Sequence, residues 1–290
     1  MDINQRCNVV NNRAPRARVL GTALRKARMD RELGLREFAK EICRDPSLLC
    51  RWESGERAPL PTEVAQILGQ LGISGRPYDE IMELANGTDD PRWLATTLGE
   101  QRVQLNALIE LERVAKTITG VAPLLIPGLL QISDYTRAIM SAGGTVPADE
   151  ISTRVAARMG RREVLTRNEP VQLTALIGEA ALHHQIGSRQ IMADQLAFLT
   201  EMAQRSNVEV RVLPYDSGWH PGLEGPFVLI DGDTANPAIH IEVRGTGMML
   251  HTQHDVDAYR QAADKVTESA ISAEDSLVVI ALAKARWESA

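Results

Sequence analysis

The stretch from Leu35 to Glu53 constrains the fold more than any other part of the sequence. It reads LREFAKEICRDPSLLCRWE, and its apolar residues recur at the spacing of two short helices separated by a brief turn. Two helices that cross steeply need a small residue where they touch, and Ala39 stands at that position. Asp45 followed by Pro46 supplies a capping side chain and a favoured first residue for the second helix. The pattern therefore predicts a helix-turn-helix.

The turn and the apolar contacts of this motif can also be assigned from the sequence. We expect four large apolar side chains to fill the angle between the two helices: Phe38, Ile42, Leu49 and Trp52. Cys43 occupies the turn position that usually adopts a left-handed conformation and is therefore usually glycine. A residue with a side chain costs on the order of 1–2 kcal/mol there, which the fold can absorb.

The charge of the chain is distributed unevenly. Residues Arg13 to Arg57 contain twelve Arg and Lys against seven Asp and Glu, which is a balance of +5. Because the whole chain has a net charge of −6 and residues 1–12 are balanced, the part from Ala58 onward carries −11. A cationic segment attached to an anionic body attracts phosphate locally and keeps the rest of the molecule away from it.

Polar residues around the second helix separate this motif from two packed helices of a bundle, which the same apolar spacing would also fit. In a helix-turn-helix, the first turns of the second helix enter the major groove of DNA. An arginine there pairs best with guanine, and apolar groups contact the thymine methyl. We predict base contacts from Pro46, Ser47, Leu48 and Arg51. We predict phosphate contacts from Arg36, Arg44 and Arg57.

Breaker residues divide the chain into two domains. The cluster Asn86-Gly87-Thr88-Asp89-Asp90-Pro91 is the best boundary. We expect a flexible arm at 1–16, an all-α helix-turn-helix head at 17–86, a linker at 87–92 and a regulatory and dimerisation domain at 93–290. Helices of the head are predicted at about 19–29, 35–42, 46–53, 61–71 and 77–85.

The second domain is predicted to be α/β or α+β, with a small sheet and C-terminal helices. Short Val/Ile-rich runs bounded by Gly, Pro and Asp predict strands at 171–177, 208–214, 226–231, 238–243 and 248–252. Helical spacing predicts helices at about 96–118, 133–142, 149–167, 189–205, 255–269 and 272–287. The helix at 149–167 is rich in arginine, and its alternation with apolar residues is typical of a solvated amphipathic helix.

Both parts of the chain resemble known families. LGLREFAKEICRDPSLLCRWESGERAP is similar to the helix-turn-helix of the phage-repressor-like (xenobiotic-response-element type) bacterial regulators, over about residues 18–72. GVAPLLIPGLLQISDYTRAIM, RVAARMGRREVLTR, TALIGEAALHH and WHPGLEGPFVLID resemble the C-terminal domain of many such regulators from actinomycetes, over about residues 93–285. The resemblance implies control of development or secondary metabolism. It also implies an antitoxin-like character, because such genes often stand beside one for a small partner protein.

Several chemical alternatives are weaker than this interpretation. Glu179 and His183 share a helix face at a spacing that suits zinc, yet no CxxC or HExxH motif accompanies them. Ser217 and His220 lie in one loop, but they do not make a catalytic triad and no GxSxG elbow occurs. We therefore expect no metal, no cofactor and no enzymatic activity.

The cysteine content and the hydropathy of the chain indicate the cellular compartment. Three cysteines, Cys7, Cys43 and Cys50, are too few for a disulfide framework, and no apolar run is long enough to cross a membrane. Oxidation of Cys43 and Cys50 inside this motif would change DNA affinity, which makes a redox switch the alternative, but we expect apolar packing for Cys50 and no role for Cys43. These features indicate a cytoplasmic protein with no membrane partner.

The sequence thus predicts a DNA-binding transcriptional regulator that binds a pseudo-palindromic double-stranded operator as a homodimer. The alternative is an antitoxin-like interaction protein in which DNA binding is secondary. The loop Ser217–Pro226 is the densest Gly/Pro-rich element of the second domain, and loops of this kind often form binding sites. We expect Trp219 and His220 in it to contact a small partner protein or a small-molecule ligand.

Overall fold

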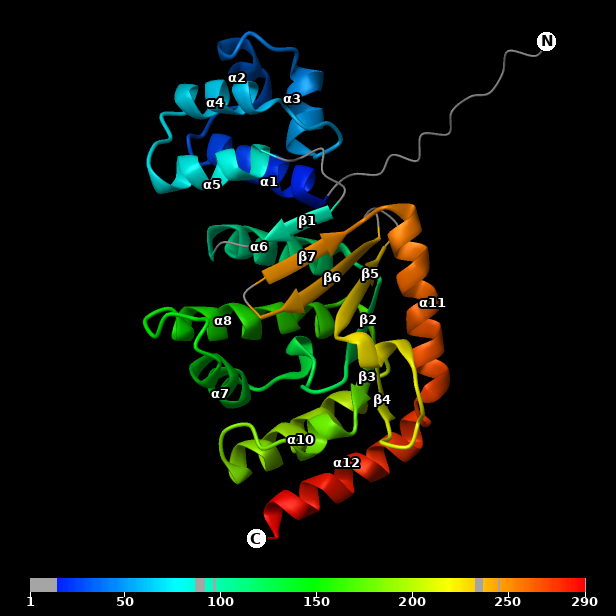
Figure 1. Cartoon of the computed structure of the whole chain (residues 1–290). Helices are drawn as coiled ribbons and strands as arrows, with labels where there is room; N and C mark the ends of the chain where they lie inside the picture. The colour runs from blue at the N-terminus through cyan, green and yellow to red at the C-terminus, as the bar shows by residue number, and fades with distance from the viewer. Residues whose placement is uncertain (1–14, 87–91, 96–97, 233–236, 245, 290) are drawn as a thin grey trace, which may run out of the picture. The chain divides into compact units, whose positions relative to one another are not determined.

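The computed structural model describes residues 15–86, 92–95, 98–232, 237–244 and 246–289. The chain has an α+β fold with a group of helices at its N-terminal end, as predicted (Figure 1). Its described residues form two compact units. The first contains the residues up to Glu110 together with Met248–Thr252, and the second contains Leu111–Gly247 and the residues from Gln253 onward. Within these described ranges no helix has the length and apolarity needed to cross a membrane.

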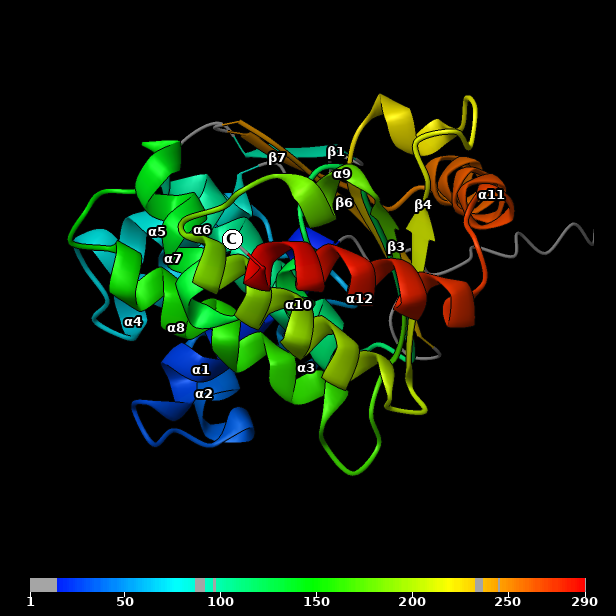
Figure 2. The same cartoon turned by 90° about the horizontal axis from the view of Figure 1, so that it is seen from below.

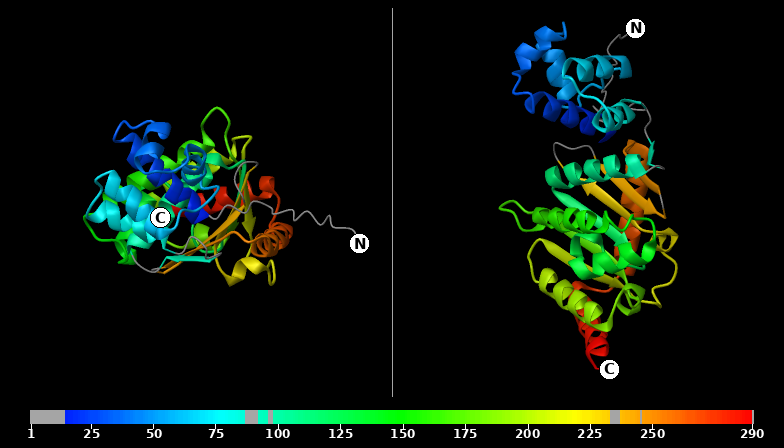
Figure 3. Two further views of the ribbon diagram at one scale, coloured as in Figure 1. Left: turned by 90° about the horizontal axis from the view of Figure 1, so that it is seen from above. Right: turned by 90° about the vertical axis from the view of Figure 1, so that its left-hand side faces the viewer.

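The first unit begins with five short helices that match the predicted ones closely: α1 (Pro15–Met29), α2 (Leu35–Glu41), α3 (Pro46–Glu53), α4 (Pro61–Gln70) and α5 (Arg76–Ala85) (Figure 3). Helix α1 packs against both α3 and α5, and α2 packs against α3. The predicted arm and linker lie mostly outside the described residues. Pro15 and Arg16, placed in the arm, belong to α1, and Arg92, placed in the linker, begins strand β1 (Arg92–Ala95).

The second unit is built on a mixed sheet in the order β6-β5-β2-β3-β4. The five strands are β2 (Thr117–Ala122), β3 (Gln172–Gly178), β4 (Val208–Leu213), β5 (Phe227–Asp231) and β6 (Ala238–Val243). Strands β2, β3 and β4 are parallel, with Thr119 opposite Thr174 and Thr174 opposite Glu209. Strand β5 is antiparallel to β2 and to β6. Strand β7 (Thr246–Leu250), predicted at 248–252, neighbours β1.

Helices cover both faces of this sheet. Helix α11 (Gln253–Ser269) packs on one face against β2, β4, β5 and β6. On the other side lie α8 (Ile151–Arg161), α10 (Arg189–Ala203) and α12 (Ala273–Glu288), and Figure 2 shows α10 and α12 side by side. The unit also contains α7 (Ser133–Gly143), α9 (Ala180–His183) and the 3-10 turns η1 (Gly128–Leu130), η2 (Arg162–Leu165) and η3 (Pro221–Glu224).

The central strand β2 corrects one prediction. A single helix was expected at 96–118, but α6 (Leu98–Val114) ends earlier and the chain enters β2 at Thr117. Ile118 continues the helical spacing of the preceding leucines, so periodicity alone does not separate the two structures. Pairing with β3 and β5 on both sides decides in favour of the strand.

The arginine-rich segment at 149–167 corrects a second prediction. Helix α8 covers only part of it, and its basic side is not a solvated surface. The guanidinium of Arg161 donates two hydrogen bonds to the Glu112 carboxylate, at 2.7 and 2.8 Å, and both side chains are buried. Arg158 donates to the side-chain oxygen of Gln131 at 3.1 Å. These arginines therefore stabilise the second unit through hydrogen bonds in its interior.

Candidate functional site

The segment from α2 to α3 has the local geometry that the sequence predicts. Cys43 adopts a left-handed conformation with φ of 53°, and the chain turns there between the two helices. Asp45 is the N-cap of α3, and Pro46 is its first residue. The Asp45 carboxylate accepts hydrogen bonds from the amide of Ser47, at 2.8 Å, and from the Ser47 hydroxyl. These hydrogen bonds hold the pKa of the Asp45 carboxyl below its ordinary value.

The predicted contacts between the helices are also confirmed. The four large apolar residues and the small one expected at the crossing are all buried, namely Phe38, Ala39, Ile42, Leu49 and Trp52. This apolar surface fixes α3 against the rest of the unit and leaves only its opposite side open to a partner.

A buried ion pair attaches the end of α3 to α1. The Arg28 guanidinium donates to both carboxylate oxygens of Glu53, at 2.7 and 2.8 Å, and also to the carbonyl of Leu33 at 2.6 Å. The side chains of Arg28 and Glu53 are only 9% and 5% exposed. The pKa of Arg28 is raised, mainly by its hydrogen bond to Glu53. Removal of one partner would leave a buried charge without compensation.

Gly21 explains how α1 and α3 approach so closely. A Cβ atom at Gly21 would lie 2.4 Å from the carbonyl oxygen of Trp52 and 2.8 Å from that of Glu53. Both are backbone atoms, so they cannot rotate away as the end of a side chain would. The packing of α1 against the last turn of α3 therefore requires glycine at this position.

The open side of α3 and its C-cap residue present four side chains at helical spacing: Ser47, Cys50, Arg51 and the C-cap Ser54, all exposed. Two of them, Ser47 and Arg51, are among the predicted base contacts, whereas Pro46 and Leu48 are half-buried on the flanks. The packing expected for Cys50 is wrong, because this thiol is exposed. Its position three residues after Ser47 is the sequence signal that places it on the same face.

The three arginines predicted to contact phosphate differ in their surroundings. Arg36 and Arg57 are exposed. Arg44 lies 3.5 Å from the Glu63 carboxylate and also donates weakly to its neighbour's carbonyl, at 3.5 Å. Part of its charge is therefore already balanced within the unit, and Arg36 and Arg57 are better placed to meet an external anion.

The two side chains predicted to bind a ligand or partner in the second unit differ in their exposure to solvent. Trp219 is 70% exposed, whereas His220 is only 3% exposed. Burial lowers the pKa of His220, so the imidazole is neutral at neutral pH. A Cβ at Gly222 would lie 2.9 Å from the His220 Nδ1, which shows how tightly this loop folds over the ring. Of these two side chains, only that of Trp219 faces solvent.

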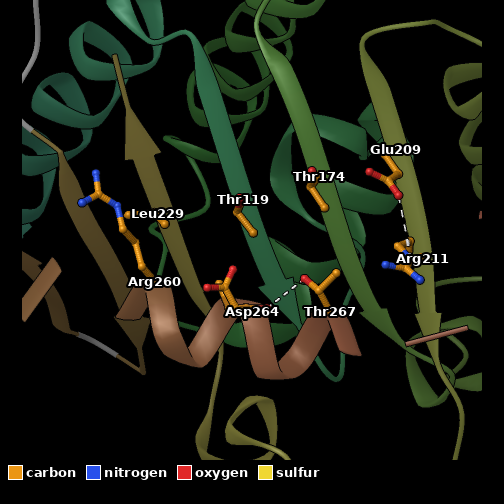
Figure 4. Close-up of a pocket in the computed structure, with 9 residues that line it drawn as sticks. Thr119, Thr174, Glu209, Arg211, Leu229, Arg260, Asp264 and Thr267 are labelled. Carbon is orange, nitrogen blue, oxygen red and sulfur yellow. Dashed lines mark hydrogen bonds and ion pairs between the residues drawn. The ribbon is translucent and has the colours of Figure 1, made fainter. Parts of the chain in front are cut away.

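A polar pocket that the sequence did not indicate lies between the sheet and α11 (Figure 4). Thr119 and Thr174, opposite each other on β2 and β3, form part of its floor. The other lining residues come from β4, β5 and α11: Glu209, Arg211, Leu229, Arg260, Ala263, Asp264 and Thr267. Its volume is 320 Å³, and its charged groups include both signs. Neither Trp219 nor His220 lines it.

The carboxylate–histidine pair considered for zinc is present at the predicted spacing. Glu179 Oε1 lies 3.7 Å from His183 Nε2, and the His183 ring stacks on Tyr215 with a centroid separation of 6.4 Å. Among the residues that the structure describes, no group of three or more His, Cys, Asp or Glu side chains is arranged to hold a metal ion.

Comparison with known proteins bears on the second unit. No curated protein matches the chain significantly. Residues 105–281 match a family model described as "Domain of unknown function (DUF5753)", and this match covers more than half of the chain. It includes the sheet, the pocket of Figure 4 and the loop with Trp219. The chain therefore belongs to the DUF5753 family.

Proposed function

We propose that this protein is a sequence-specific DNA-binding transcriptional regulator in which α2 and α3 form a helix-turn-helix and α3 is the recognition helix. The observation that carries the proposal is the open side of α3. Its four exposed side chains combine hydroxyl, thiol and guanidinium groups, with no carboxylate among them. The opposite side of the same helix is held by buried apolar contacts and by the Arg28–Glu53 ion pair. A rigid helix with a polar, cationic outer face suits the major groove.

The side chains of α3 suggest distinct roles in base recognition. The Arg51 guanidinium is exposed, and among the residues that the structure describes its one hydrogen bond is a long one, 3.4 Å, to the Ser47 carbonyl of its own helix. It can therefore turn outward and donate to O6 and N7 of a guanine. The Ser47 hydroxyl donates a hydrogen bond to the Asp45 carboxylate, so toward DNA it acts as an acceptor, for example from the amino group of cytosine or adenine.

Arg36 and Arg57, beside this face, would position the protein on DNA by contacting phosphates. Both are exposed, and both lie in the segment Arg13–Arg57 with its balance of +5. Phosphate contacts of this kind contribute affinity that does not depend on base sequence and that falls as salt rises.

The second unit, in this proposal, dimerises and senses a small partner protein or a ligand. A single motif of this type reads few base pairs, so such domains usually act as two-fold pairs. We expect half-sites about one helical turn apart, roughly 34 Å, or a multiple of it. A partner that prefers one arrangement of the pair would change DNA affinity by its differential binding. The exposed indole of Trp219 supports a contact of this type.

The test is to select DNA fragments bound by the full-length protein and to compare three arginine variants on the selected site. Arg51→Ala is expected to cost about 1–3 kcal/mol and to relax the preference at one base pair. Arg57→Ala should weaken binding to all sequences alike and reduce the salt slope by about one. Arg76→Ala is the control, because Arg76 is exposed in the same unit but pairs with Glu80 on α5.

Two outcomes would contradict the proposal. If Arg51→Ala retained full specificity while Arg57→Ala altered it, the assignment of base and phosphate contacts would be reversed. If the lone protein selected no DNA and bound an operator only together with a partner protein, the antitoxin-like alternative would replace it.

A further inference from the structure

Helix α12 has an exposed apolar stripe that the rest of its unit does not cover. Val278 and Leu282 are 57% and 68% exposed, and they are four residues apart on one side of the helix. Ala281 and Ala285 are exposed beside them, and the side chains are small enough to let another helix approach closely. The opposite side of α12, with Ser276, Ile280 and Ala283, is buried, so the helix is already fixed in place. The stripe thus takes no part in packing α12 against its own unit.

The charges at the two ends of the stripe are opposite and symmetrically placed. Glu274 and Asp275 lie in the first turn of α12, and Arg286 lies in its last turn. Glu274 and Arg286 are equally far along the helix from Ile280, and Val278 and Leu282 are also equally far from it. All of these side chains except that of Ile280 are exposed.

From this symmetry we propose that α12 pairs in antiparallel orientation with α12 of a second copy of this chain. The two-fold axis crosses the pair of helices at the level of Ile280 along the helix. In that arrangement Val278 of each copy contacts Leu282 of the other. Arg286 of each copy meets the acidic first turn of the other, so both ends are complementary at once. A two-fold interface requires that the same patch be complementary to itself, which this stripe is.

The neighbouring helix extends the same surface. A shallow groove of 250 Å³ beside the stripe is lined by Ala197 and Thr200 of α10 and by Ala281, Lys284 and Glu288 of α12. Lys284 and Glu288 already pair with each other at 3.1 Å. Their charges are therefore balanced within one copy, and Arg286 is left as the basic group that matches the acidic turn.

This inference deepens the proposed function, since it identifies the surface by which the second unit would dimerise. It is tested without DNA, by measuring the dimerisation constant of the full chain by sedimentation equilibrium at low salt. Leu282→Glu would place a charge at the centre of the interface and is expected to weaken dimerisation at least a hundredfold. Leu223→Glu is the matched control, because Leu223 is 59% exposed in η3, which packs against α11, and it should leave the constant unchanged.

A charge exchange tests the antiparallel register. Arg286→Glu is expected to weaken dimerisation about tenfold or more at low salt, and Glu274→Arg is expected to weaken it less, because Asp275 remains. A mixture of these two single variants should form a heterodimer more tightly than either variant forms a homodimer, since both ends become complementary again. A monomeric parent protein, a dimer insensitive to Leu282→Glu, or a mixture no tighter than its components would overturn the inference. Those results would leave DNA binding by the first unit to be judged on its own test.

Discussion

Replacement of Gly21 by alanine tests whether the position of α3 depends on its close contact with α1. The new Cβ would lie 2.4 Å from the Trp52 carbonyl oxygen, 2.8 Å from that of Glu53 and 2.9 Å from the Glu53 carbonyl carbon. In proteins a Cβ atom essentially never lies within 3.0 Å of a non-bonded heavy atom from another part of the chain. Helix α1 must therefore move away from the last turn of α3, which also carries Glu53.

The magnitude follows from two opposing effects. Alanine is a better helix former than glycine by about 0.5–1 kcal/mol in a helix interior. Forcing extra volume into a packed contact costs typically about 1–3 kcal/mol. Because the obstructing atoms belong to the backbone, we expect the upper part of this range to apply and the net result to be destabilisation by about 1–2 kcal/mol. The loss should be concentrated in α1 and α3.

Gly69→Ala provides the matched control. Gly69 lies in α4 and is exposed, and a Cβ there would meet nothing within 4 Å. The same chemical change should therefore stabilise the protein slightly at this position, by up to about 1 kcal/mol. Hydrogen exchange of the amides of α1 and α3 in the full chain measures both effects locally. Equal protection in the two variants would refute the argument that Gly21 is required for the approach of the helices.

Two further predictions concern the residues that hold α3. Glu53→Ala should destabilise the first unit by about 3–5 kcal/mol, because it leaves the buried Arg28 charge unpaired, whereas Arg28→Met combined with Glu53→Leu should recover most of the loss. Denaturant unfolding and hydrogen exchange of the amides of α3 would show this. A double variant whose loss of stability equals the sum of the losses of the two single variants would contradict it. For Asp45, the depressed pKa means that its contribution to stability is present above the ordinary aspartate pKa and is lost as the pH falls through the lowered value. An NMR titration of the Ser47 amide should follow this protonation with a midpoint below about 3.9, and Asp45→Asn should abolish the transition.

Local features of the sequence were sufficient for most of the first unit. The cap at Asp45, the favoured Pro46 and the spacing of Phe38 and Ile42 all act over four residues or fewer. Such interactions are present in the chain before any long-range contact forms. Cys43 also adopts the left-handed conformation that its position in the short turn between the two helices predicts.

Only the tertiary structure decided the features that depend on residues distant in the chain. Thr117–Ala122 became the central strand because β3 and β5 pair with it on both sides, although its spacing also fits a helix. Arg161 was buried because Glu112, on another element, supplies the carboxylate that compensates its charge. The polar pocket of Figure 4 likewise collects residues from four strands and α11, which no local pattern brings together. Periodicity and capping report on neighbours along the helix or strand, whereas burial of a charge and choice of a sheet partner depend on what the folded chain places against them.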